Sequence, residues 1–186
     1  EHLIPTFNRH FEEGNRLSEE LIILKDRSSK KIGYWERRKA KKAINHYQKC
    51  LELIPDHWPS KWLSAKLYQA TAEPSKALQL FKEAMQIEKL NPDIAREASI
   101  SAMDAGEVEL AVKYSLEAIN RQPGDAGLIC NHAINLMISG KDEEALKWME
   151  KAIELEPDDP INQNAHMLIK DVMGGIQRRP RFDELN

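Results

Sequence analysis

The residue pattern that most limits the folds open to this chain is a 34-residue spacing of small side chains. One series consists of Ala43, Ala77, Ala111 and Ala145, and a second, seven residues later, of Cys50, Ala84, Ala118 and Ala152. Between them stand Tyr47, Phe81, Ser115 and Met149. Positions spaced i, i+4 and i+7 form one stripe on an α-helix, where small side chains allow a neighbouring helix to approach closely. We therefore expect repeated helical units that pack against one another.

Residues that break helices recur in the same register. Prolines follow the second small residue closely, as Pro55, Pro123 and Pro157, while Pro92 comes three residues late in its repeat. Proline cannot continue a helix because it lacks the N–H group and clashes with the preceding turn. Gly106 and Gly140 lie five residues before an alanine of the first series, where a left-handed residue separates two helices. Each repeat is thus predicted to be a helix–turn–helix.

Composition argues for the same architecture. Only five residues of the 186 are valine or threonine, namely Val108, Val112, Val172, Thr6 and Thr71. These residue types favour strands, so their scarcity argues against a Rossmann fold, a TIM barrel, a β-sandwich or an OB-fold. The hydrophobic content of 41% is too high for a disordered chain.

The repeat pattern resembles the tetratricopeptide repeat (TPR) family. The clearest match carries Leu136, Gly140, Ala145, Met149, Ala152, Leu155 and Pro157. The resemblance implies an all-α fold, a right-handed superhelical solenoid of antiparallel helix pairs with about four repeats and a C-terminal capping helix. The expected divisions are a divergent hairpin at 1–57, repeats at 58–91, 92–125 and 126–159, the capping helix at 160–175 and a polar tail at 176–186.

The first repeat departs from the family pattern, because its first helix is displaced upstream. We predict a long helix near 8–26, a break at Asp26–Lys31, and a second helix near 32–54 with Ser28 or Ser29 as N-cap. At the other end, Asp159 is a good N-cap, Pro160 suits the first helical position, and Gly174–Gly175 end the capping helix.

The sequence contains no recognisable catalytic motif. It lacks the glycine-rich phosphate loops, the HExxH zinc motif, the GxSxG nucleophile elbow and CxxC. We therefore predict a non-enzymatic protein without a cofactor or metal. His132 and His166 lie one repeat apart, but a metal site needs further ligands. We interpret them as hydrogen-bonded packing residues.

The family resemblance implies that the first helix of each repeat lines a concave groove. The candidate partner-binding residues there are Trp62, Arg96, Ile100, Met103, Asn131, Ile134, Met137, Ile138 and Leu168. An apolar stripe of this kind favours an amphipathic helix or an apolar peptide as partner, although a register error of one place would make it ordinary core. A subset of the family grips the terminal carboxylate of chaperone tails. Only Asn131 fits that clamp, so we exclude it.

Charge is unevenly distributed along the chain despite a formal net charge of −3. A basic patch comprises Lys30, Lys31, Arg37, Arg38, Lys41 and Lys42, with Tyr34 and Trp35 among them. It is either a solvated helix face or a surface for nucleic acid or another anionic partner. The acidic run from Asp142 to Asp159 at the other end permits weak head-to-tail self-association.

The leading functional hypothesis is a scaffold that binds a protein or peptide in the groove. The alternatives are a positioning domain of a larger enzyme, because the chain does not begin with Met, and a binder of nucleic acid. Two cysteines make no disulfide framework, so we expect a cytoplasmic location. No apolar run is long enough for a membrane helix. Phe182 in the tail is a peptide-like anchor, so a tail lying in the groove would compete with a partner.

Overall fold

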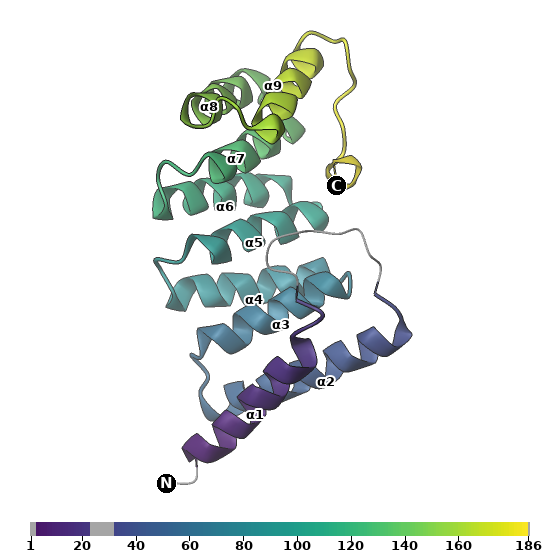
Figure 1. The fold of residues 1–186 in the computed structure, drawn as a ribbon, viewed down its shortest axis with the longest axis vertical. Coiled ribbons are helices and arrows are strands. Elements are labelled where there is room, and N and C mark those ends of the chain that lie inside the picture. The colour runs from purple at the N-terminus through teal and green to yellow at the C-terminus, as the bar shows by residue number, and fades with distance from the viewer. Residues whose placement is uncertain (1–2, 23–31, 186) are drawn as a thin grey trace. The chain divides into compact units, whose positions relative to one another are not determined.

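A computed structural model describes residues 3–22 and 32–185 of the chain, and in those ranges it contains helices but no strand (Figure 1). The chain divides into two compact units, Glu1–Lys89 and Leu90–Asn186, called unit 1 and unit 2 below. In each unit, every helix packs against the helix that follows it in that unit. The expected all-α fold is confirmed.

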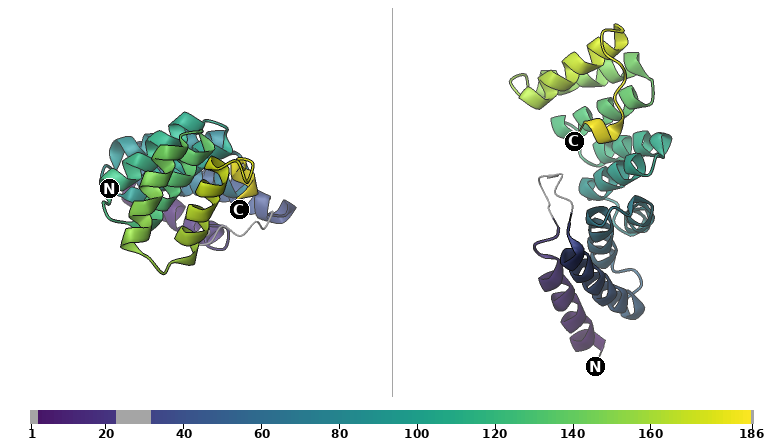
Figure 2. Two further views of the ribbon diagram at one scale, coloured as in Figure 1. Left: turned by 90° about the horizontal axis from the view of Figure 1, so that it is seen from above. Right: turned by 90° about the vertical axis from the view of Figure 1, so that its right-hand side faces the viewer.

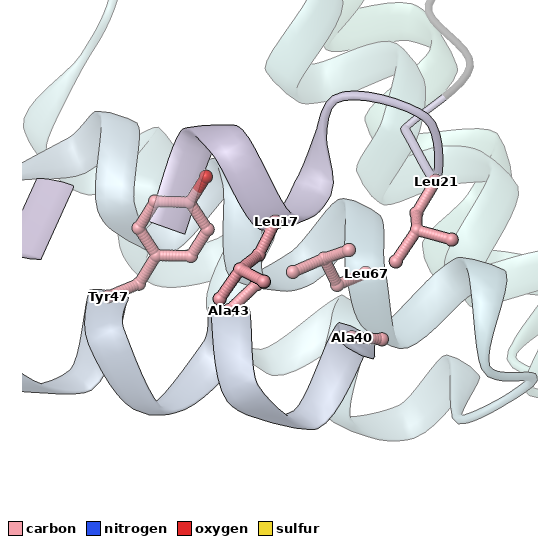
Figure 3. Packing of buried hydrophobic residues seen from close by; sticks show 6 residues of the cluster. All are labelled: Leu17, Leu21, Ala40, Ala43, Tyr47 and Leu67. Carbon is pink, nitrogen blue, oxygen red and sulfur yellow. The ribbon is translucent and has the colours of Figure 1, made fainter. Parts of the chain in front are cut away.

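Unit 1 contains four described helices. They are α1 (Leu3–Ser18), α2 (Tyr34–Leu53), α3 (Trp58–Ala70) and α4 (Pro74–Ile87). Its core brings together α1, the turn after it, α2 and α3 through Leu17, Leu21, Ala40, Ala43, Tyr47 and Leu67 (Figure 3). The small side chains of α2 let α1 approach closely, and the ring of Tyr47 fills the space beside them.

The phenol hydroxyl of Tyr47 contacts two polar side chains of α1, those of Asn15 and Ser18. Its hydroxyl donates to Oδ1 of Asn15 at 2.9 Å and lies 2.9 Å from the hydroxyl of Ser18. Burial raises the pKa of Tyr47 to about 12, so the phenol stays protonated. A Cβ placed on Gly14 would stand 2.7 Å from the Tyr47 ring, so a glycine is needed for the two helices to meet.

The boundaries of the first two helices differ from the prediction. Helix α1 begins at Leu3 and ends at Ser18, rather than running from 8 to 26. At its last residue, the Ser18 hydroxyl donates to the carbonyl of Asn15. Helix α2 begins at Tyr34, and the Glu36 carboxylate accepts a hydrogen bond from the N–H of Gly33. The predicted caps Ser28 and Ser29 and the break at Asp26–Lys31 fall on the undescribed stretch 23–31.

Unit 2 contains five helices and a short 3-10 helix. They are α5 (Pro92–Asp104), α6 (Val108–Arg121), α7 (Ala126–Ile138), α8 (Asp142–Leu155), α9 (Pro160–Met173) and η1 (Phe182–Glu184). Asn91, Asp125 and Asp159 cap α5, α7 and α9 through side-chain oxygens that accept backbone N–H groups. Helix α9 packs against both α7 and α8, and the predicted cap Asp159 and first-turn Pro160 are confirmed.

The turns within the helix pairs use the left-handed conformation expected for glycine. Gly106 has φ of 79° and Gly140 has φ of 87°. The equivalent position of the preceding repeat is Ala72, which also has positive φ, at 59°. The backbone is therefore strained at Ala72, which carries a Cβ, and unstrained at the equivalent glycines of unit 2.

The repeating small side chains are fully buried. Ala77, Ala84, Ala111, Ala118, Ala145 and Ala152 all have 0% exposure. Each unit also contains one buried free thiol, Cys50 in unit 1 and Cys130 in unit 2. Burial raises the pKa of both cysteines, that of Cys130 to about 11, so both are held as thiols.

Candidate functional site

Eight of the nine predicted groove residues lie on α5, α7 and α9 of unit 2. Their exposure is uneven: Asn131 is exposed, Met103 and Met137 are buried, and Arg96, Ile100, Ile134, Ile138 and Leu168 are half-buried. The two methionines therefore belong to the core of the folded chain rather than to an open stripe. Of the predicted apolar stripe, only the half-buried side chains of Ile100, Ile134, Ile138 and Leu168 are therefore partly open to solvent. Partner binding by these residues stays a prediction.

The charge of Arg96 is already compensated by neighbouring acids. Its guanidinium lies 3.1 Å from the carboxylate of Asp93 and 3.2 Å from that of Glu97. Glu97 is only 4% exposed, so its carboxylate needs a nearby cation. Arg96 is thus engaged in a structural ion pair in the folded chain.

The ninth candidate, Trp62, belongs to α3 of unit 1. Its indole ring is half-buried, and its buried N–H group has no hydrogen-bond acceptor among the described residues. Trp58, one turn earlier on the same helix, is also half-buried. These aromatic rings thus contribute area to the packing of unit 1, with part of each ring open to solvent.

His132 forms a buried polar contact with a partner that the sequence pattern did not identify. Its Nδ1 lies 2.7 Å from the hydroxyl of Ser115, and its ring packs edge-on against Trp148 with centroids 5.1 Å apart. Burial, and secondarily the charge of Lys141, lowers the pKa of His132 to about 4, so the ring is neutral. The interpretation of His132 as a hydrogen-bonded packing residue is confirmed. No group of three metal-ligating side chains comes together in the described ranges.

The C-terminal tail, residues 178–185, runs back from α9 along the other helices of unit 2 (Figure 2). Its first anchor is the turn between α7 and α8. The Arg179 guanidinium donates to the carbonyl of Met137 at 2.6 Å. It also donates to both carboxylate oxygens of Asp142, at 3.1 and 2.9 Å. Gly140 lies beneath it, since a Cβ there would stand 3.4 Å from the guanidinium. This bidentate arrangement is the strongest geometry for an arginine and a carboxylate.

A second contact holds the far end of the tail. Pro180 is buried, Phe182 is half-buried, and η1 packs against α5. Figure 1 shows the yellow tail running from the end of α9 to α5. The tail therefore reaches two of the three unit 2 helices that carry predicted groove residues.

The tail also folds on itself. Arg178 makes two hydrogen bonds to the carboxylate of Glu184, at 3.0 and 2.8 Å, and the N–H of Arg181 donates to the same group at 2.9 Å. These bonds, that of Arg178 first, lower the pKa of Glu184 to about 2. Adjacent arginines thus have different roles, because Arg178 shapes the tail whereas Arg179 attaches it to the helices.

The described part of the basic patch lies on α2 of unit 1. Arg37 donates to the carbonyl of Thr71 at 2.8 Å, and Arg38 lies over the exposed rings of Tyr34 and Trp35. Lys41 and Lys42 are exposed, while Lys30 and Lys31 fall outside the described residues.

A cavity of about 740 Å³ lies beside the basic patch. Its lining includes Arg37, Lys41, Tyr68 and Lys76. The positive charge of this lining is partly neutralised by Glu73, whose carboxylate pairs with Lys76.

Several solved protein structures share the fold of this chain. The chain resembles the crystal structure of a MamA protein with a TM-score of 0.75 at 15% identity, covering 91% of this chain and 83% of that one. It also resembles YrrB, described as a TPR protein with an unusual peptide-binding site, with a TM-score of 0.69 at 16% identity over 95% and 81% of the two chains. These likenesses show a fold built of stacked helix pairs.

Two stretches of the sequence match a known family. The tetratricopeptide repeat model matches residues 34–57 and 126–159. The chain therefore contains tetratricopeptide repeats at these two stretches.

A third solved structure is that of the first TPR of Spaghetti (RPAP3) bound to an HSP90 peptide. Its TM-score is 0.58 at 16% identity, over 63% of this chain and 93% of that one. Among curated proteins, the human protein O-mannosyl-transferase TMTC3 is 33% identical over 121 residues, which are 63% of this chain. The match spans only 13% of that relative's length. No helix in the described ranges is both long and apolar enough to cross a bilayer.

Proposed function

We propose that this chain is a non-enzymatic interaction scaffold whose peptide-binding surface is the α5–α7–α9 face of unit 2. The observation that carries the proposal is the tail, an extended segment that lies against α5 and the end of α7 through a bidentate arginine, a buried proline and a half-buried phenylalanine. A surface that accepts one such segment has the chemistry to accept another. Solved TPR neighbours that bind peptides support the proposal.

The proposed surface combines apolar and polar contacts. Ile100, Ile134 and Leu168 are half-buried, so part of each side chain remains open to a partner, and exposed Asn131 offers an amide to a peptide backbone. Arg96, the one cation among the predicted groove residues, is already paired with Asp93 and Glu97 and is not free to bind a terminal carboxylate. We therefore propose recognition of an internal peptide segment rather than of a free C-terminus.

A displayed library of random peptides tests this function. Peptides selected on the intact chain are expected to lose at least tenfold in affinity on Ile134→Asp, because the new carboxylate would be desolvated beneath the peptide. Leu116→Asp on α6 is the matched control and should keep binding, since Leu116 is exposed on a helix outside the proposed surface.

Asn131→Glu, at an exposed position, supplies a second variant that spares the core. The proposal fails if the selected peptides bind both α7 variants as tightly as the wild-type chain. It also fails if Ile134→Asp simply unfolds the protein while Asn131→Glu has no effect.

A second candidate is a positioning domain within a larger protein. The observation that favours it is the match to a much longer transferase, of which this stretch covers 13%. In that setting the same surface would hold a partner near a catalytic region elsewhere in the polypeptide. The sequence of the complete gene tests this directly, because an open reading frame limited to these residues would exclude it. We also propose a cytoplasmic location, which fractionation with a tagged full-length protein would check.

A further inference from the structure

We propose that the C-terminal tail is an intramolecular ligand of unit 2, and that the natural partner replaces it with an extended peptide carrying an arginine, a following proline and an aromatic residue two places later. This inference rests on the proposed function and specifies its ligand. Its basis is the Arg179 site, which is made by the turn between α7 and α8 and not by the tail itself.

The residues that bind Arg179 follow the repeat pattern except at one position. The carbonyl of Met137 and the turn residue Gly140 have counterparts one repeat earlier in Met103 and Gly106. The carboxylate of Asp142 has none, because the equivalent residue is Val108 and, two repeats earlier, a proline begins α4. The repeated backbone is thus supplemented by a single acid at the place where the arginine binds.

The acid is set up to receive a cation. The Asp142 side chain is 18% exposed, and the adjacent first turn of α8 adds Glu143 and Glu144. The arginine that pairs with it retains 34% exposure, so the pair can exchange with solvent or with another arginine. Such a contact is held by directional bonds rather than by deep burial, as expected for a replaceable ligand.

The tail presents its three contact residues in a peptide-like order. Arg179 enters the acid site, Pro180 is buried directly after it, and Phe182 begins η1, which packs on α5. The Arg178–Glu184 and Arg181–Glu184 bonds stay within the tail and shape it. A partner therefore needs the Arg-Pro-x-aromatic chemistry, whereas the flanking charges serve the tail's own conformation.

The test uses a fluorescent peptide with the sequence of residues 177–186 and a chain truncated after Gln177. Truncation there preserves the hydrogen bonds from Ile176 and Gln177 to the carbonyl of Asp171, which cap α9. The truncated chain should bind the peptide. An attached tail acts at an effective concentration on the order of 1 mM, so the intact chain should bind it about tenfold more weakly if the peptide Kd is about 100 µM.

Adjacent arginines provide a matched control. Arg179→Ala in the peptide should weaken binding to the truncated chain about tenfold or more, because it removes the bidentate pair with Asp142. Arg178→Ala should change binding less than about threefold, because Arg178 is exposed and its two hydrogen bonds to Glu184 stay within the tail. Asp142→Asn in the truncated chain should reproduce the loss seen with Arg179→Ala.

The inference is overturned if the truncated chain is folded but does not bind the peptide, or if the two arginine substitutions weaken binding equally. Should truncation prevent folding, the full chain with Arg179→Ala takes its place and must bind the peptide about tenfold more tightly than wild type. A tail-dependent dimer in sedimentation would also overturn it, because the tail would then serve a second copy. Library peptides that bind through Ile134 while the tail peptide fails would leave the proposed function standing and remove only this inference.

Discussion

Acidification should destabilise unit 2 through one buried ring. His132 is 2% exposed, with Nδ1 bonded to the Ser115 hydroxyl and Trp148 against its edge. Its pKa is about 4 in the folded chain and close to 6.5 when unfolded. Because the folded pKa is the lower one, the neutral ring's contribution to stability is complete above pH 6.5. It is lost as the pH falls from about 6.5 to about 4.

The magnitude follows from the proton uptake of the unfolded chain. Between pH 7 and pH 5 the unfolded histidine becomes almost fully protonated while the folded ring stays neutral. This difference corresponds to at most about 2 kcal/mol, and allowing for solvent screening we expect a loss of about 1–2 kcal/mol. The NMR titration of the His132 ring carbons should show no transition near pH 6.5.

Urea unfolding at pH 7 and pH 5 measures the effect, with Trp148 as the fluorescence reporter. It is the only one of the four tryptophans in unit 2, and phenylalanine replaces the others. His132→Asn retains a possible acceptor for Ser115 but cannot titrate, so its stability should change less between the two pH values. Ser115→Ala should lose about 1 kcal/mol at both. If His132→Asn lost as much stability on acidification as wild type, the reasoning would be refuted.

Three further substitutions test the backbone and packing arguments. Ala72→Gly should raise stability by up to about 1 kcal/mol, because it removes a positive φ from a residue with a Cβ. Gly106→Ala should lower it by about 1 kcal/mol through the backbone alone, since its Cβ would meet nothing within 4 Å. Denaturant titration would contradict both if the two changes had the same sign. Gly14→Ala should lower stability by about 1–3 kcal/mol, because the added Cβ would press on the buried Tyr47 ring. An unchanged melting temperature would exclude that clash.

The repeat spacing allowed the helix pairs to be predicted because helix crossings and turns restrict which residue type can occupy a single position. A small residue at Ala111 or Ala145 is needed wherever two helices cross closely, and a glycine at Gly106 or Gly140 is needed wherever φ is positive. Requirements of this kind are visible in residue identity alone. The C-terminal end of α1 was harder to predict, because Ser18 there contacts the hydroxyl of Tyr47, 29 residues later.

The candidate site shows where single-sequence reasoning stops. Met103 and Met137 have the spacing of a groove stripe, but spacing alone does not distinguish an exposed face from a buried one. Ser115 is small, whereas the equivalent residues of the other repeats are large. This difference indicates that Ser115 has a different packing partner. The structure shows that His132 from the next helix reaches its hydroxyl.

The contact between Arg179 and Asp142 joins residues 37 positions apart. No local pattern in the tail predicts which helix end it meets. The sequence does show that Asp142 stands where the preceding repeat has Val108. The reason for this difference is visible only in the structure, where the tail's Arg179 binds Asp142.

The two buried thiols make the chain its own reporter of partial unfolding. Cys50 lies in unit 1 and Cys130 in unit 2, and neither is accessible to an alkylating reagent while its unit is folded. Reaction of each thiol therefore records an opening of the helices around it. Peptide-resolved alkylation would give two opening rates from one sample. Equal rates would mean that the units open together, whereas unequal rates would rank them by their resistance to opening.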